Sequence, residues 1–248
     1  MAAILRRFLA ICLIWLAAFA PAQAGFWVWD SGAWRAVQHP YVWDAGAWRA
    51  VQNGWVWDSG SWHKFFTACT PATFAHDSGS GSDATPAGAV QLIVQVVGGG
   101  AQGGSGFNDG MGGEFSGGGA SGGGYAVKTI SSPSGSYSWS VGVDGSGGSQ
   151  GGTSSASGSA ISMSATGGFP GGTANFFSDG VGATSVGSAS GGDSNFNGNV
   201  GLSGGGGSGG AGGTSAYGGG YGKGGDGGNP FSGGAFGTPG RVVLTFTC

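Results

Sequence analysis

The distribution of glycine constrains this chain more than any other feature. The sequence has 248 residues and 62 glycines, and 54 of these glycines lie between Gly98 and Gly240. Ordering a glycine costs about 0.5–1 kcal/mol more than ordering an alanine, and sparse side chains cannot offset that cost. The region is therefore either a flexible linker or an ordered structure in which nearly every backbone N–H group has a hydrogen-bond partner.

The remaining composition favours order. Hydrophobic residues make up 39% of the chain and aromatic residues 12%, while charged residues make up only 8%. Disordered chains usually have few aromatic residues and many charges. The low charge also argues against nucleic acid as a partner, because no basic stripe is present to neutralise phosphates.

Segments typical of strands flank the glycine-rich region. In "AVQLIVQVVGGG", residues Leu92, Val94 and Val96 alternate with other side chains, and "GRVVLTFTC" alternates in the same way at Val242, Leu244 and Phe246. We expect these two flanks to pair and close the region. Further strand patterns occur at 125–130, 137–143 and 159–165. A linker has no reason to be bracketed in this way.

One backbone geometry would satisfy so many glycines. Polyproline-II-type helices have three residues per turn and rise about 3.1 Å per residue, and without side chains they can approach closely and bond to one another, parallel or antiparallel. Collagen is excluded because there is no strict Gly-X-Y period and proline is scarce. We therefore expect a mainly β and irregular fold, in which small antiparallel strands bracket a sandwich of polyglycine-II helices, with very little α-helix outside an N-terminal signal peptide.

An internal repeat precedes this region. The copies "WVWDSGAWRAVQHP", "YVWDAGAWRAVQNG" and "WVWDSGSWHKFF" begin at Trp27, Tyr41 and Trp55. Asp at the fourth position and Gly at the sixth are turn residues, so we expect five or six short strands in an antiparallel meander. The tryptophans either form a surface that binds sugars or quaternary ammonium groups, or form the core of a very small domain.

The repeat has a weak resemblance to the choline-binding and cell-wall-binding repeats of bacterial surface proteins. It is carried by Gly54-Trp55-Val56 and Gly60-Ser61-Trp62. Where those repeats have a second aromatic residue, this chain has Arg35, Arg49 and His63. Choline binding is therefore not expected. Short repeats of a similar kind also occur as spacers in phage tail proteins.

The first 24 residues have the pattern of a secretion signal. Arg6 and Arg7 precede an apolar run, and "AQA" at 22–24 offers small residues for cleavage after Ala24. The run is short for a membrane span, although an uncleaved anchor is the alternative. We expect a secreted or cell-surface protein with the following parts: a signal peptide at 1–24, three tryptophan-rich β-hairpin repeats at 25–66, a linker and the strand leading inward at 67–97, and a glycine-rich domain at 98–248.

Two cysteines remain after cleavage. Cys69 lies just before the glycine-rich region and Cys248 is the last residue of the sequence. In an oxidising compartment we predict that they form a disulfide. Two buried free thiols, or pairing between chains, are the alternatives.

The order of motifs carries a second resemblance. "VVGGG", "GGGYAVKTI", "YSWSVGVDGSGG", "GGDSNFNGNVG", "AYGGGYGKGGDGG" and "GTPGRVVLTF" follow one another between about residues 70 and 248. This series resembles the glycine-rich domain at the tips of bacteriophage tail-fibre adhesins. The resemblance implies a stack of polyglycine-II helices whose distal loops bind host-surface receptors. A virion tail is then the alternative location, and a phage or a bacterial origin both stay open.

The candidate ligand-binding residues interrupt the glycine runs. They are Phe107, Asn108, Asp109, Phe115, Phe169, Asn175, Phe176, Phe177, Phe196, Tyr217, Phe231 and Phe236. The alternative is that they cap the helices as core. We expect them to bind a cell-surface glycan or an outer-membrane protein, with a tail-fibre or homo-oligomeric partner also conceivable and no nucleic acid.

Enzymatic activity is not expected. Asp109 and Glu114 could be imagined as a glycosidase pair, but acids in glycine loops are more often turn residues. The histidines His39, His63 and His76 have no metal-ligand spacing, and no cofactor or metal is expected. The main alternative to an adhesin is a secreted structural or matrix protein whose glycine-rich body has no specific ligand.

Overall fold

The structure is a computed structural model that describes residues 26–30, 32–37, 40–44, 46–205 and 210–248. The predicted signal peptide, residues 1–24, lies outside the described residues. Those that are described form strands, turns and extended segments, without a helix among them, which confirms the prediction of a mainly β protein. It follows that the described residues contain no helix long and apolar enough to cross a membrane. The chain divides into two compact units, Met1–Ala68 and Cys69–Cys248.

The first unit consists of three β-hairpins. They are β1 (Phe26–Asp30) with β2 (Ala33–Val37), β3 (Tyr41–Asp44) with β4 (Ala47–Ala50), and β5 (Asn53–Asp58) with β6 (Ser61–Thr67). Each pair is its own two-stranded sheet, so the expected continuous meander is wrong for the described residues. The tight turn lies inside each copy, whereas the first join contains Pro40, which has no N–H group for a strand ladder.

The turn of the third hairpin explains the glycine in the repeat. Ser59 and Gly60 connect β5 to β6 with φ angles of 50° and 86°. Positive φ at both positions is the signature of the type I′ turn, whose twist matches that of the flanking strands. The predicted role of the repeat glycine is confirmed here.

The described residues of the second unit include two five-stranded antiparallel sheets. The first sheet has the order β17 (Ser194–Phe196), β12 (Tyr125–Ser131), β9 (Gln91–Val97), β18 (Arg241–Thr247) and β7 (Ala72–His76). The second has the order β16 (Ala189–Ser190), β15 (Ile161–Ala165), β14 (Ser154–Gly158), β13 (Ser136–Ser140) and β8 (Ser80–Ala84). The segment 67–97, expected to be a linker and one strand, thus contains β7 and β8 as well as β9.

The flanks of the glycine-rich region pair as predicted. β9 and β18 lie side by side in antiparallel register, with Val94 opposite Leu244. Both side chains are fully buried. Together with Tyr137 and Met163 of the second sheet they belong to one hydrophobic cluster, so the core lies between the two sheets.

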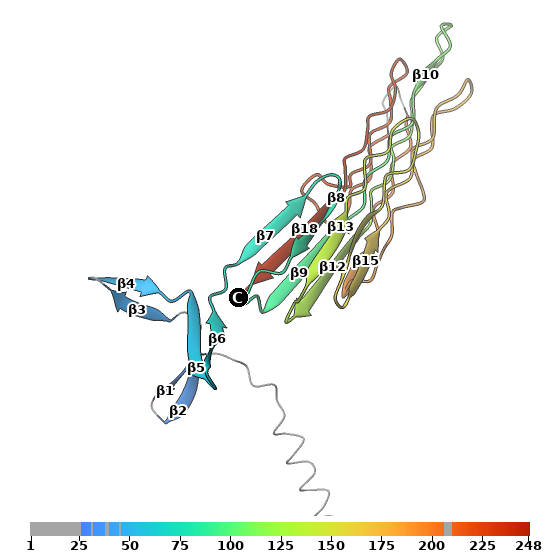
Figure 1. Cartoon of the computed structure of the whole chain (residues 1–248). Helices are drawn as coiled ribbons and strands as arrows, with labels where there is room; N and C mark the ends of the chain where they lie inside the picture. The colour runs from blue at the N-terminus through green and yellow to red at the C-terminus, as the bar shows by residue number, and fades with distance from the viewer. Residues whose placement is uncertain (1–25, 31, 38–39, 45, 206–209) are drawn as a thin grey trace, which may run out of the picture. The chain divides into compact units, whose positions relative to one another are not determined.

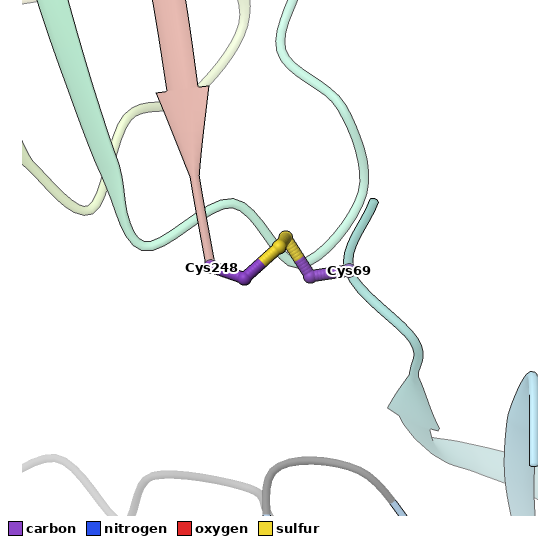
Figure 2. Close-up of a disulfide and its surroundings, with 2 residues drawn as sticks. All are labelled: Cys69 and Cys248. Carbon is purple, nitrogen blue, oxygen red and sulfur yellow. A yellow bond between two sulfur atoms is a disulfide. The ribbon is translucent and has the colours of Figure 1, made fainter. Parts of the chain in front are cut away.

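A disulfide closes the second unit at the sheet end. Cys69 and Cys248 are bonded, with Cα atoms 5.7 Å apart, which confirms the predicted pairing (Figure 2). Cys69 precedes β7 and Cys248 follows β18, and these two strands are neighbours, with Phe246 opposite Ala72. The bond therefore fastens the first and last strands of the unit to each other.

Between the sheet strands, glycine-rich segments run side by side as extended chains away from the sheets (Figure 1). Residues 116–124, the central segment, are all buried. Their N–H groups donate to one neighbouring segment at every third residue. With N···O distances of 2.8–2.9 Å, these bonds join Gly117 to Gly228, Ala120 to Gly225, and Gly123 to Gly222. The same spacing of three joins Gly118 to Gly172, Ser121 to Phe169, and Gly124 to Thr166.

Among the described residues, six segments form hydrogen bonds with the central segment. The N–H groups of Gly119 and Gly122 donate to Leu202 and Asn199, and carbonyl groups of the central segment accept from three more segments. These three contribute donors at Gly98 and Gly104, at Gly180, Ala183 and Gly187, and at Gly210 and Gly213. From the start to the end of the central segment, the residue numbers of the partners fall in some neighbouring segments and rise in others. Some neighbours therefore run antiparallel to the central segment and others run parallel to it. Buried backbone groups are thereby paired without a continuous sheet.

We expect loss of the disulfide to lower the melting temperature. In the chain-entropy model, closing a loop of this length stabilises the fold by about 5 kcal/mol at most, equivalent to roughly 10–20 °C for a unit of this size. Thermal melting followed by circular dichroism of the double variant Cys69→Ser/Cys248→Ser checks this. Wild-type protein in reductant is the control, and an unchanged melting temperature in both would contradict the account.

We expect Gly118→Ala to destabilise the unit, because its Cβ would overlap the backbone carbonyl of Val181. Backbone cannot rotate away as a side chain can, so the cost is about 3 kcal/mol, or roughly 6–12 °C in melting temperature. Gly233→Ala is the matched control, because a Cβ there meets only the Ser105 hydroxyl at 3.9 Å. Equal melting temperatures for the two variants would show that the tight approach is not needed.

Candidate functional site

Three loops that the structure describes in full gather where the glycine-rich segments end, away from the sheets. We call the loops 105–116, 173–180 and 229–234 the tip; β10 (Phe107–Asn108) marks it in Figure 1. Backbone hydrogen bonds join the loops at their bases: Ala174 donates to Ser105 at 2.9 Å, and Gly106 donates to Ser232 at 3.1 Å. The three loops therefore form one end of the molecule's second unit.

The first tip loop is a small hairpin. β10 pairs with β11 (Glu114–Phe115), with Phe107 opposite Phe115. In the turn, one carboxylate oxygen of Asp109 accepts the N–H groups of Met111 at 2.7 Å and Gly113 at 2.8 Å. These backbone donors lower the pKa of Asp109 below its ordinary value of 3.8. Asp109 is thus a turn residue, and its ionised carboxylate fixes the conformation of the loop.

The second and third loops contribute exposed phenylalanines. The ring of Phe176 lies 5.6 Å from Phe107 and 5.5 Å from Phe177. Asn175 Oδ1 accepts the N–H of Phe177 and fixes this turn. Phe177 is 86% exposed and Phe231, in the third loop, is 78% exposed. The tip therefore presents aromatic side chains that nothing in the described chain covers.

The tip is acidic as well as apolar. Its charged residues are Asp109, Glu114 and Asp179, and its three loops contain no lysine or arginine. Asp179 accepts the N–H of Ser116 at 2.7 Å and so joins the second loop to the first. Such a surface has no attraction for polyanions and suits an apolar or hydroxyl-rich partner.

Eight of the twelve candidate residues lie at the tip. Phe169 and Phe236 lie instead along the flank of the glycine-rich segments, where Phe169 lines an open depression of about 330 Å³ with Pro170 and Val181. Phe196 and Tyr217 lie at the sheet end, in contact with Tyr125. The spacing of aromatic residues between glycine runs cannot tell tip positions from flank or sheet-end positions. The location of each residue depends on which way its segment runs.

One exposed, large apolar residue of the described tip was not among those candidates. Met111 is 82% exposed in the first loop, between two aromatic-bearing strands. Flexible, polarizable methionines are common on binding surfaces. The signal in the sequence was a single apolar residue inside "DGMGGE".

The described tryptophans of the second and third hairpins are exposed, and four of them pair within their own hairpins. Trp43 and Trp48 pair edge to face at 5.3 Å, and Trp57 and Trp62 repeat this geometry at 5.4 Å. All four of these indoles, and Trp55 too, are more than half exposed. Among the described side chains the tryptophans are therefore not buried as the core of a small domain. A sugar-binding or ammonium-binding surface stays a prediction.

The described residues contain no group of three His, Cys, Asp or Glu side chains that could hold a metal ion. His76, one of the histidines considered from the sequence, bonds to Asp83 at 2.7 Å and stacks on Trp139 at 3.6 Å. It therefore joins β7 of the first sheet to β8 and β13 of the second. His63 bonds to Ser61 in the third hairpin.

We expect the order of the first tip loop to depend on pH. Because the folded pKa of Asp109 is lowered, its stabilisation is fully present above the ordinary value of 3.8 and is lost as the pH falls through the lower folded value. NMR amide exchange at Met111 and Gly113 should accelerate, relative to the intrinsic rate, between about pH 4 and pH 2. Asp109→Asn should abolish this dependence, and a loop that loosens equally in both proteins would refute the assignment.

Comparison with known proteins gives no family. No family model matches the chain, and no curated protein sequence matches it. The geometry of the tip and the chemistry of its residues are therefore the grounds on which a function is proposed.

Proposed function

We propose that this chain is a non-enzymatic, adhesin-like protein of the cell exterior that binds a cell-surface glycan or an outer-membrane protein through its tip. The observation that carries the proposal is the cluster of uncovered phenylalanines at the end of a long, backbone-bonded body. Contiguous exposed apolar side chains on a folded protein mark interaction sites. A virion tail is the alternative location for the same activity.

The hydrogen bonds support a polyglycine-II sandwich as the body. Bonds that return to the same neighbour at every third residue fit a helix with three residues per turn. Six surrounding segments, both parallel and antiparallel, fit helices packed side by side. Such a body is stiff because each segment is tied to several others, and it would hold the tip loops in fixed positions.

The side chains at the tip support binding rather than catalysis. Aromatic anchors with few rotatable bonds contribute much of the energy in protein interfaces, and Phe176, Phe177 and Phe231 are of this kind. The Asp109 carboxylate is occupied by backbone donors of its own loop.

A structural or matrix protein without a ligand is the competing function. It gives no reason to leave several phenylalanines uncovered in loops that are themselves fixed by side-chain hydrogen bonds. The resemblance to phage tail-fibre tip domains also favours receptor binding.

The decisive experiment is binding of the mature chain to a panel of Gram-negative cells. Phe176→Ser/Phe177→Ser should lower the affinity at least about tenfold, since two anchors are lost. Phe236→Ser is the matched control, because Phe236 is 62% exposed but lies on the flank; this variant should bind as wild type. Equal losses in both variants, or no cell binding by the wild-type chain, would favour the matrix function.

A further inference from the structure

Aromatic rings form a continuous strip where the first sheet meets the glycine-rich segments. Phe196 stacks on Tyr125 with ring centroids 5.7 Å apart and planes 14° apart. Tyr217 meets Tyr125 edge-on at 5.4 Å and lies 6.2 Å from Tyr221. The guanidinium of Arg241 lies 4.3 Å from the centre of the Tyr221 ring. We call these five residues the aromatic strip.

Strand register places the strip on the outer face of the first sheet. Tyr125 lies opposite both Phe196 and Val97, and Arg241 lies opposite Val97. Directly opposed residues point to the same face, and the neighbouring Val96 is buried in the core on the other face. The strip therefore crosses β17, β12, β9 and β18 on the side away from the core.

The loop that supplies two of the rings has an unusual backbone. In "YGGGY", Gly218, Gly219 and Gly220 have φ angles of 72°, 62° and 84°, a left-handed region that other residues rarely adopt. A Cβ on Gly218 or Gly220 would meet nothing within 4 Å. These glycines are thus needed for the shape of the loop and not for close packing. That shape holds Tyr217 and Tyr221 side by side.

Polar groups lie beside the rings, and the two charged groups among them have opposite signs. Gln95 Nε2 donates to the hydroxyl of Tyr125 at 2.8 Å, and the hydroxyl of Tyr221 donates to Asp77 at 3.1 Å. The other carboxylate oxygen of Asp77 lies 3.1 Å from Nε of Arg241. Burial, and then the bond to Asp77, raises the pKa of Tyr221 above its ordinary value of 10.0.

We propose that the aromatic strip binds a neutral hexose oligosaccharide. A pyranose ring has a C–H face that packs on aromatic rings and a rim of hydroxyl groups that pairs with amide, carboxylate and guanidinium groups. Phe196 is 44% exposed and offers an apolar surface at one end of the strip. Asp77 already neutralises Arg241, so the strip has no unpaired cation for a uronate or a phosphate.

This site is separate from the tip. Gly98 follows Val97 beneath the strip, and Gly106 precedes Phe107 at the tip, so about nine extended residues separate the two places, or roughly 28 Å at 3.1 Å per residue. Sugar binding by the strip does not depend on a receptor for the tip.

The test is an array of neutral hexose oligosaccharides (glucans, mannans and galactans) beside the matching uronates. The mature chain should bind at least one neutral member. Phe196→Ala and Tyr217→Ala should weaken that binding about tenfold. Tyr217→Phe, which keeps the ring, should weaken it less. Melting curves establish that each variant is folded, and Phe236→Ser, an exposed position on the flank, is the control that should bind sugar as wild type. Phe176→Ser/Phe177→Ser is measured beside it to separate the strip from the tip.

Several results would overturn the proposal. They are binding of no neutral sugar, binding of uronates alone, equal binding by folded strip variants, or self-association of the chain that Phe196→Ala abolishes. A loss of sugar binding in the tip variant would place the sugar at the tip instead. Cell binding that fails while sugar binding persists would refute the tip proposal and leave the strip intact.

Discussion

Hydrogen bonding between neighbouring backbones is the constraint on which the second unit depends. Few side chains in the glycine-rich segments can drive burial, so their amides must find carbonyl partners in other segments, each bond contributing about 0.5–1.5 kcal/mol. Such segments approach so closely that a Cβ on Gly118 or Gly119 would overlap a neighbour's backbone carbonyl. Glycine is costly to order, yet it alone permits this approach. The entropic cost of ordering glycine and the close approach of backbones both follow from its lack of a side chain.

This arrangement decides where chemistry can occur. The central segment contains only glycine, alanine and serine, all of them buried, so the aromatic and charged groups collect where segments turn back. One collection is the tip, with Phe107, Phe176 and Phe231, and the other is the aromatic strip beside the first sheet. The two sheets and the Cys69–Cys248 bond hold the opposite end of the unit. A rigid body with binding groups at its ends is the design that the proposed adhesin function uses.

The sequence predicted the main strands of the second unit. It did not predict which loops and side chains come together in space. Alternating apolar residues such as Leu92 and Leu244 mark β9 and β18 because one face of each strand is buried. β8 and β14 have the sequences "SGSDA" and "SSASG", which carry no strand propensity; they form because neighbouring strands supply ladder partners. Phe196 looked equivalent to Phe231 in the sequence, and only the direction of each segment places them at opposite ends.

Native-state amide hydrogen exchange tests the central claim most directly. If the backbone bonds of the glycine-rich segments are the main source of order, residues 116–124 should exchange as slowly as β9 and β18, through opening of the whole unit. The two sheets would then be no more protected than the glycines between them. Exchange of residues 116–124 at the rate of an unstructured peptide, with protection confined to the sheets, would contradict the account.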